Sequence, residues 1–340
     1  MRLLRRLHIA LTCVLAGGLP PGLAWSADEP RVAASAQTRA PFSRGVLFRI
    51  DKPGVPPSHV FGTVHSGDLR VVALAKPVRE ALADARTLAL EIRLGEGDIA
   101  AFFDAAQFDD GRRLDDFFDP PTVAAIRAAL ADAVPDGAAL ARLKPWAVLL
   151  KLAEQPVATG DGAETLDHAL LVAAIRRKLA VVALESPDEQ IAAFDAIPLP
   201  TQVALVKFVL QDREALTRDH DAVVAAWLDR DLERLAALNA EPGRLHPEVA
   251  PHLAELTRHL VDDRTVLMAH RLFVPLRGGR VFVAVGALHL YGERGLLALL
   301  RAQGYRVRRV WRRATKDDRP RRRMEAVPPA RPRRLRNDAP

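Results

Sequence analysis

Short apolar runs separated by polar, glycine-containing loops recur along this chain, and two of them end in the same tetrapeptide pattern. The first run begins at His59 and closes as Gly62-Thr63-Val64-His65. The second begins at Val281 and closes as Gly286-Ala287-Leu288-His289. Runs rich in β-branched and aromatic residues are typical of strands, and a glycine at the end of a strand lets the backbone turn sharply or approach a ligand closely. The pattern therefore predicts two strands, each followed at once by a histidine.

Each of these predicted strands is followed by a helix and a second strand. The expected elements are helix Lys76–Ala85 and strand Thr87–Ile92 in the first half, and helix Glu293–Gln303, a Gly304 C-cap and strand Tyr305–Val310 in the second. The same order of elements near both ends of the domain is a weak internal repeat. It indicates two related halves that face one site.

The region between the two halves is rich in alanine and in helical periodicity. The predicted helices are Pro120–Leu130, Lys144–Leu152, Glu164–Arg177, and amphipathic segments over Gln202–Ala237 and Pro251–Leu272. One apolar run among them, Ala180–Leu184, predicts a buried strand. The sequence thus predicts an α/β fold, in which two related strand–Gly-x-x-His–helix–strand halves form a small mixed sheet with a long helical insertion. A third match, Gly243-Arg244-Leu245-His246, stands between two prolines with no strand before it and predicts a loop.

The N-terminal segment is predicted to lie outside the folded domain, which we place at residues 44–311. Residues 1–26 combine a basic start with a short apolar core, as a secretory signal peptide does, and residues 27–43 form a flexible linker. Cleavage after Ser26 implies a periplasmic or secreted protein. The single cysteine, Cys13, lies in the signal peptide, so the mature protein has no thiolate ligand or disulfide.

The C-terminal tail, residues 312–340, carries the excess positive charge of the chain. It holds eleven Arg and Lys against four Asp and Glu, an excess equal to the formal net charge of +7. Several prolines and almost no large apolar residues predict a solvated, disordered tail. The alternative is electrostatic contact with an anionic surface such as lipid head groups. Nucleic acid is not an expected partner, because the protein is expected outside the cytoplasm and no aromatic residues interleave the basic ones.

Three side chains share a place at the end of a predicted strand: His65, Glu91 and His289. Glu91 closes an apolar run, where an unpaired carboxylate would be costly to bury. Two imidazoles and a carboxylate are a common ligand set for Zn²⁺, Mn²⁺, Co²⁺ or Fe²⁺, and such an ion can activate water and polarise a scissile carbonyl. The alternatives are structural. Strand-end histidines are often hydrogen-bonded framework residues, and Glu91 can equally serve as a cap or a salt-bridge acceptor.

Three further residues have open interpretations. Glu185 is a fourth candidate by its place after a strand, or it lies at the entry of the next helix. Arg264 forms a solvated ion pair unless its helix face turns towards the site, and Thr63 orients a ligand or caps a turn. The histidines on charged helices are assigned to the surface or to packing: His168, His220, His252, His259 and His270. The sequence contains no His-Glu-x-x-His, Gly-x-Ser-x-Gly, phosphate-binding glycine loop or dinucleotide fingerprint.

Several of these motifs together resemble the TraB/GumN family, which includes the Tiki proteases. The residues that carry the resemblance are Phe61–His65, the strand ending in Glu91, Lys144-Pro145-Trp146, Ala183–Ser186 with Gln190, Val285–Leu290, Gly295–Leu297 and Gly304-Tyr305. They run in order over most of the predicted domain. Three positions depart from the family's usual pattern: Leu288 replaces a glycine, Thr265 replaces an asparagine, and Arg177–Ala180 replaces Gly-Lys-Pro.

The resemblance implies an α/β domain with two related halves and, from the Tiki members, a metal-dependent peptidase that uses His65, His289 and Glu91. We therefore expect an exported metal-dependent hydrolase that acts on a polypeptide in the cell envelope with Mn, Co or Zn. Glu185 and Arg264 would support this site from its surroundings or in the transition state. The alternatives are a non-catalytic ligand- or haem-binding envelope protein on the same scaffold, or a regulatory protein with vestigial histidines. Low aromatic and methionine content argues against a haem pocket.

Overall fold

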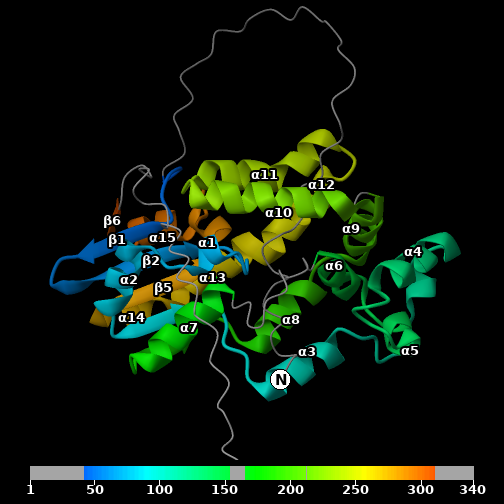
Figure 1. The fold of residues 1–340 in the computed structure, drawn as a ribbon, viewed down its shortest axis with the longest axis horizontal. Helices are drawn as coiled ribbons and strands as arrows, with labels where there is room; N and C mark the ends of the chain where they lie inside the picture. Colours follow the sequence, from blue (N-terminus) through cyan, green and yellow to red (C-terminus); the bar gives the residue numbers. More distant parts are fainter. Residues whose placement is uncertain (1–41, 154–164, 212, 311–340) are drawn as a thin grey trace, which may run out of the picture.

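The computed structural model of the chain describes residues 42–153, 165–211 and 213–310 (Figure 1). The predicted signal peptide, almost all of the linker and the basic tail lie outside the described residues. The described chain forms one six-stranded mixed sheet and many helices, which confirms the predicted α/β class. The strands are β1 (Leu47–Lys52), β2 (Val55–Thr63), β3 (Thr87–Leu90), β4 (Ala180–Ala183), β5 (Val281–Gly286) and β6 (Arg306–Arg309).

The helices fall into three groups along the chain. Before the insertion come α1 (Leu69–Val72) and α2 (Lys76–Ala83). The insertion contains α3 (Glu96–Ala105), α4 (Pro120–Leu130), α5 (Gly137–Ala141), α6 (Pro145–Ala153), α7 (Leu166–Arg176), α8 (Pro187–Asp195), α9 (Leu199–Gln211), α10 (Arg213–Leu228), α11 (Leu232–Leu245) and α12 (Ala250–Thr257). The last group is α13 (Asp263–Arg271), α14 (Phe273–Gly278) and α15 (Leu296–Ala302). Short 3-10 helices cover Leu114–Asp116 and Ala287–Leu290, and a π-helix covers Arg258–Asp262.

The two predicted halves are interleaved in the sheet, whose strand order is β4-β3-β5-β2-β1-β6. Strand β5 lies between β2 and β3 and pairs with both in parallel. β4 continues this parallel set, whereas β1 runs antiparallel to both β2 and β6. In the β2–β5 pair, Thr63 stands opposite Gly286. The carboxyl ends of β2, β5, β3 and β4 therefore meet at one edge of the sheet.

Two hydrophobic cores hold the chain together, one around the sheet and one among the helices of the insertion. In the first, Phe61 on β2 packs against Phe282 on β5, with ring centroids 5.9 Å apart. In the second, Trp146 on α6 stacks on Phe194 of α8 at 5.0 Å. Figure 1 shows the sheet with its covering helices at one side and helices α3 to α6 at the other, with α8 between them. The sheet edge described above faces this helical part.

The structure corrects several expectations about single elements. Strand β4 is an edge strand with neighbours on one side only, so Ala180 and Ala183 are exposed and the strand is not buried as predicted. Residues 243–245 continue helix α11 and are not a loop, because the helix accommodates Pro242 inside it. Helix α15 starts at Leu296, three residues later than expected. Strand β1, which pairs with β2, was not predicted at all.

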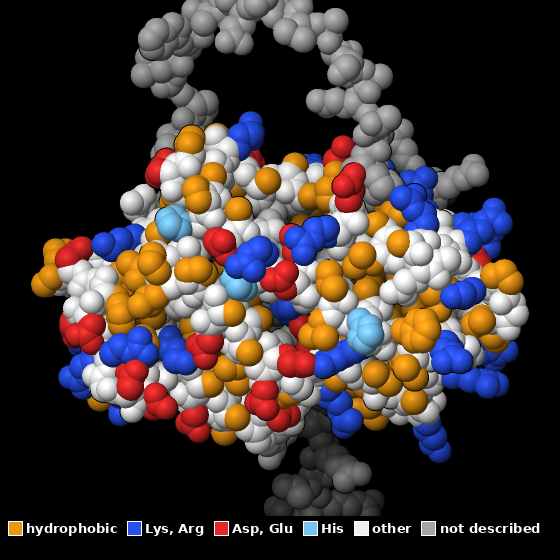
Figure 2. Space-filling view, turned by 180° about the vertical axis from the view of Figure 1, so that it is seen from behind, with side chains coloured by type: hydrophobic (Ala, Val, Ile, Leu, Met, Phe, Trp, Pro, Cys, Tyr) orange, Lys and Arg blue, Asp and Glu red, His pale blue; other side chains and the backbone are white. Residues whose placement is uncertain are grey.

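On the face shown in Figure 2, side chains of both charge signs are interspersed with apolar ones. Within the described ranges, no single helix is long and apolar enough to cross a membrane. The bent pair α8 and α9 passes that test together, by length and composition only.

Candidate active site

The two Gly-x-x-His motifs lie side by side because they follow adjacent parallel strands. Gly62 of the first motif packs directly against the second: a Cβ at Gly62 would stand 3.1 Å from Ala287 Cα and 2.7 Å from Leu290 Cδ1. The glycine is thus required for close approach between the two halves. His65 follows β2 directly, and His289 lies in the 3-10 helix after β5. The structure brings the two predicted halves to one site.

Glu91 stands at the end of β3, next to β5, and its carboxylate is bound from two directions. The backbone N–H of Gly286 donates to Oε1, and Arg264 Nη2 donates to Oε2 at 2.9 Å. His289 Nε2 lies 3.7 Å from the same Oε1. Burial by itself would raise the pKa of Glu91, but the neighbouring His289 imidazole, the Arg264 guanidinium and His65 outweigh it and hold the pKa at about 2. Glu91 is therefore an ionised acceptor of a salt bridge.

Arg264 and Glu185 form a buried pair beside Glu91. Arg264 Nε donates to Glu185 Oε1 at 2.8 Å, and Nη2 donates to Glu185 Oε2 at 2.6 Å, a two-pronged geometry that fixes both side chains. Arg264 is 5% exposed and Glu185 is 2% exposed. Helix α13 thus turns Arg264 inward, so the arginine is not the solvated ion pair that the sequence suggested as its default. Glu185 lies at the sheet edge with Glu91, as its strand-end place predicted.

His289 is held in one orientation by Thr265 of α13. Thr265 Oγ1 lies 2.7 Å from His289 Nδ1, and its hydroxyl donates a hydrogen bond to the Val261 carbonyl at 2.6 Å. With its only proton used, the hydroxyl accepts from Nδ1–H, which leaves the lone pair on Nε2 facing Glu91. Burial is the largest cause that lowers the pKa of His289, to about 4, so the ring is neutral near pH 7. Thr265 thus fixes both the tautomer and the orientation of His289.

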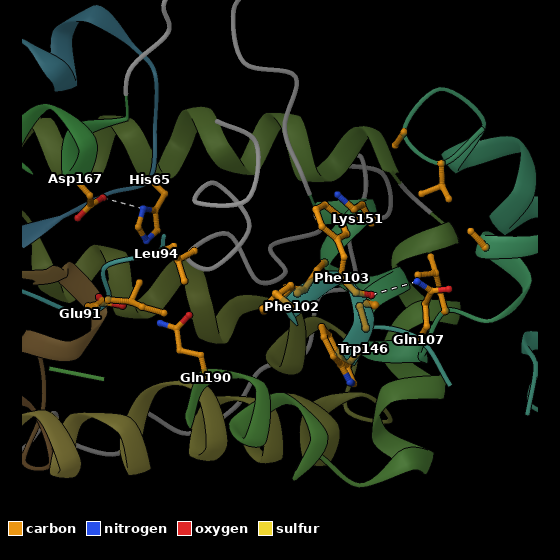
Figure 3. Close-up of a pocket in the computed structure, with 18 of the residues that line it drawn as sticks. His65, Glu91, Leu94, Phe102, Phe103, Gln107, Trp146, Lys151, Asp167 and Gln190 are labelled. Atoms are coloured by element: carbon orange, nitrogen blue, oxygen red, sulfur yellow. Dashed lines mark hydrogen bonds and ion pairs between the residues drawn. The ribbon is translucent and has the colours of Figure 1, made fainter. Parts of the chain in front are cut away.

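His65 is held by a residue that sequence reasoning missed. Its Nδ1 lies 2.8 Å from Asp167 Oδ2, in the first turn of α7, whose N-cap is Thr165 (Figure 3). Burial lowers the pKa of His65, but the Asp167 carboxylate, with Glu91, outweighs burial and raises it. The ring edge opposite Asp167 faces the pocket. Asp167 gave no sequence signal, because an acidic residue in the first turn of a helix is ordinarily a partner of the helix dipole.

The remaining candidates have less direct places. Thr63 Oγ1 is buried without a hydrogen-bond partner among the described residues. His220 Nε2 lies 3.3 Å from Ser66 Oγ, and His252 Nδ1 lies 3.0 Å from Thr201 Oγ1, as packing residues do. His168 lines the pocket described next.

A pocket of about 370 Å³ opens at this sheet edge and runs towards the helical part. His65, Glu91 and Asp167 lie at one end, whereas Phe102, Phe103 and Trp146 line the other (Figure 3). Gln190, part of the motif set, lies on its wall. A concave, mostly apolar pocket with a few convergent polar groups is the usual form of a ligand or active site.

The arrangement of donor atoms determines whether the three expected ligands can hold a metal ion. Among the described residues, no group of three or more His, Cys, Asp or Glu side chains is arranged to hold a metal ion. Two of the three expected ligands do converge, since His289 Nε2 and Glu91 Oε1 are 3.7 Å apart and both are electron-pair donors. Each oxygen of Glu91 has two acceptor sites, and each accepts one hydrogen bond, from Arg264 or from the Gly286 backbone. Both oxygens therefore retain acceptor capacity.

The chain was compared with known proteins and families. No curated protein and no solved structure matches it. The model of the TraB/PrgY/gumN family matches residues 46–309. This range begins just before β1 and ends in β6, so it contains both Gly-x-x-His motifs, the two glutamates and Arg264. The match covers most of the chain and confirms the resemblance drawn from the motifs: the protein belongs to the TraB/PrgY/gumN family.

Proposed function

We propose that this protein is an exported hydrolase of polypeptides that works with a divalent metal ion bound by His65, His289 and Glu91. The observation that carries the proposal is the 3.7 Å approach of His289 Nε2 to Glu91 Oε1, with the His289 ring fixed through its other nitrogen. Two buried electron-pair donors that face each other need a cation or a proton between them. His65, which follows β2, lines the same pocket as Glu91.

The charge of the site supports a divalent cation. Arg264 is shared between Glu91 and Glu185, and Asp167 adds a third carboxylate, so this group has two negative charges in excess when both imidazoles are neutral. Two negative charges in excess within a largely buried site favour an ion of charge +2. The neutral state of His289, which burial enforces, is also the form in which imidazole binds a metal.

The chain's own residues have distinct parts in this proposal. Asp167 lies against Nδ1 of His65, which lines the pocket, and Thr265 fixes His289 so that its Nε2 faces Glu91. Arg264 holds Glu91 and Glu185 together, and its Nε, Nη1 and Nη2 donate hydrogen bonds to Glu91, Glu185 and the Leu260 carbonyl. It is therefore a positioning residue in this arrangement. The bound metal would supply a water of lowered pKa and polarise the scissile carbonyl.

Metal titration of the mature full-length protein tests the proposal. After treatment with a chelator, the protein is titrated with Mn²⁺, Co²⁺ and Zn²⁺ by calorimetry, and hydrolysis of a mixed set of fluorescence-quenched peptides is followed with each ion. We expect one ion per chain and hydrolysis that depends on it. The proposal would be refuted if none of the three ions binds stoichiometrically and no peptide is hydrolysed at any ion concentration.

The pH dependence of this binding is set by His65. Protons compete with the metal for imidazole, and Asp167 raises the pKa of His65. As the pH falls through this raised pKa, we expect the metal affinity to drop by about tenfold per pH unit, the slope for one proton. His289, with its pKa at about 4, competes only in stronger acid. Calorimetric titrations between pH 8 and pH 5 measure the slope, and an affinity independent of pH would argue against His65 as a ligand.

Export is the second part of the proposal, and it rests on residues 1–26. We expect N-terminal sequencing of the protein recovered from the cell envelope to begin close to Ala27, because the basic start and short apolar core fit signal-peptidase processing. Replacing Leu11 with Arg interrupts the apolar core and should trap the full-length precursor. Recovery of unchanged Met1 from the wild-type protein would contradict this part of the proposal alone.

A further inference from the structure

The apolar end of the pocket is a groove with a defined wall. We use the name apolar groove for the part lined by Phe102, Phe103, Leu143, Trp146 and Leu150. These residues come from α3, α6 and the segments next to them, so the insertion between the two halves builds the groove. In Figure 3 the groove lies at the opposite end of the pocket from His65 and Glu91.

The wall of the groove is fixed before any ligand binds. The Trp146 indole stacks on Phe194, and Phe102 packs edge-on against it with ring centroids 5.6 Å apart. Trp146 Nε1–H donates to Asp195 Oδ1 at 2.7 Å, which satisfies the polar atom of the ring. A rigid aromatic wall with its polar atom already bonded offers apolar surface and no hydrogen bond to a ligand.

The polar side chains near the far end are also engaged within the protein. Gln107 donates to the Phe103 carbonyl at 3.3 Å and accepts from Arg142 Nη2 at 3.0 Å. The Lys151 ammonium lies over the Phe103 ring, 5.7 Å from its centroid. Polar groups that converge on open pocket space are thus concentrated at the His65 end. The pocket combines a reacting end with an apolar end.

We propose that the apolar groove is a specificity subsite that binds one or two bulky apolar side chains of the polypeptide next to the scissile bond. The inference rests on the proposed function for the reaction itself, but the groove stands on its own geometry. A pocket of about 370 Å³ lies within the range of about 300–1,000 Å³ typical of ligand sites. Its continuity with the strand-end residues places a bound apolar side chain beside the bond to be broken.

Matched peptides test the specificity. Quenched peptides that differ only in carrying Leu-Phe or Ser-Ala at adjacent positions are compared by kcat/KM with the wild-type holoprotein. We expect a preference of at least about tenfold for the apolar pair, since discrimination in apolar pockets is of about 10- to 200-fold per group. Equal cleavage of both peptides would overturn the subsite while leaving the hydrolase intact.

A pair of neighbouring substitutions on α5 locates the effect. Ala139 lines the pocket, whereas Ala138 is exposed and does not. Ala139→Phe should fill the groove and reduce the apolar preference to less than about threefold, and Ala138→Phe should leave it unchanged. Phe103→Ala, which enlarges the groove, serves as a second variant if Ala139→Phe fails to fold. A preference that survives in both groove variants would overturn the inference.

A binding measurement separates this inference from the proposed function. With EDTA present to halt hydrolysis, the anisotropy of a fluorescein-labelled Leu-Phe peptide reports binding to the wild-type protein and to both α5 variants. Binding that is weakened about tenfold by Ala139→Phe would support the groove whatever the outcome of the metal-loaded hydrolysis assay. If the metal-loaded protein hydrolyses no peptide in that assay, the proposed function alone is refuted. Tight binding of laurate without any binding of the peptide would show that the groove takes acyl chains, and would overturn the inference.

Discussion

Replacing His65 or His289 with alanine is expected to abolish stoichiometric binding of a divalent ion and to lower peptide hydrolysis by at least about 100-fold. Each substitution removes one imidazole from a site where His289 Nε2 already lies 3.7 Å from Glu91 Oε1. Neither ring supports the sheet itself, because each follows its strand. Circular dichroism should therefore show a folded protein in both variants, while calorimetry shows no binding.

Two control variants sharpen this prediction. His246→Ala, in the third Gly-x-x-His match, should change neither binding nor hydrolysis, because that histidine follows α11 and packs against Phe208. Asp167→Asn alters only the partner of His65 and should weaken metal affinity by about 10- to 100-fold without abolishing it. Full activity in His289→Ala would show that the geometry of the strand ends is architectural.

Loss of the Arg264 guanidinium is expected to have the largest effect on stability. Arg264→Met leaves the buried carboxylates of Glu185 and Glu91 without their shared counter-charge, and removing one partner of such a pair costs about 3–5 kcal/mol. Urea denaturation at pH 7.5 measures the change. The matched control is Arg271→Met, whose partner Glu189 and whose own side chain are 35% and 36% exposed, so that we expect a loss of no more than about 1 kcal/mol.

The difference in unfolding free energy between wild type and Arg264→Met should be smaller in acid than at pH 7.5. Burial already raises the pKa of Glu185 despite its bond to Arg264, and without the guanidinium both carboxyl groups should bind protons more readily in the folded state than in the unfolded state. An acid whose pKa is raised by folding stabilises the folded state below that pKa, so the gap from wild type should narrow between pH 7.5 and pH 4.5. Adding Glu185→Gln to the Arg264→Met variant should also reduce this difference in unfolding free energy at neutral pH. An unchanged deficit under both conditions would exclude a charge origin.

Which parts of the site were visible in the sequence depends on how each residue reaches it. His65, Glu91, His289 and Glu185 follow strands directly, and apolar runs ending in a polar residue are a local pattern. The adjacency of β2 and β5 follows from the order of strands in space, which local patterns do not determine. The sequence predicted that the two halves face one site but not that β5 separates β2 from β3.

Residues that reach the site from helices were harder to predict. Asp167 lies one hundred and two residues after His65, in a helix whose first turn carries an ordinary acidic signal. Arg264 stands in an acidic, strongly polar stretch, and only the π-helix at Arg258–Asp262 and its packing decide which face turns inward. There the Leu260 and Val261 carbonyls accept hydrogen bonds from Arg264 and Thr265. Helical periodicity assumes regular turns, so it does not predict such a face.

The central position of β5 also determines when the candidate site can assemble during synthesis of the chain. The backbone N–H of Val281 in β5 donates to Oγ of Ser58 in β2, 223 residues earlier in the chain. The position between β2 and β3 in the sheet is not filled until β5 has been synthesised. Pairings between such distant segments form late and slowly. A chain interrupted between Glu91 and β5 therefore has His65 and Glu91 but no assembled site. If the protein is exported and hydrolytic as proposed, this order of assembly would delay its activity until nearly all of the chain up to β5 is in place.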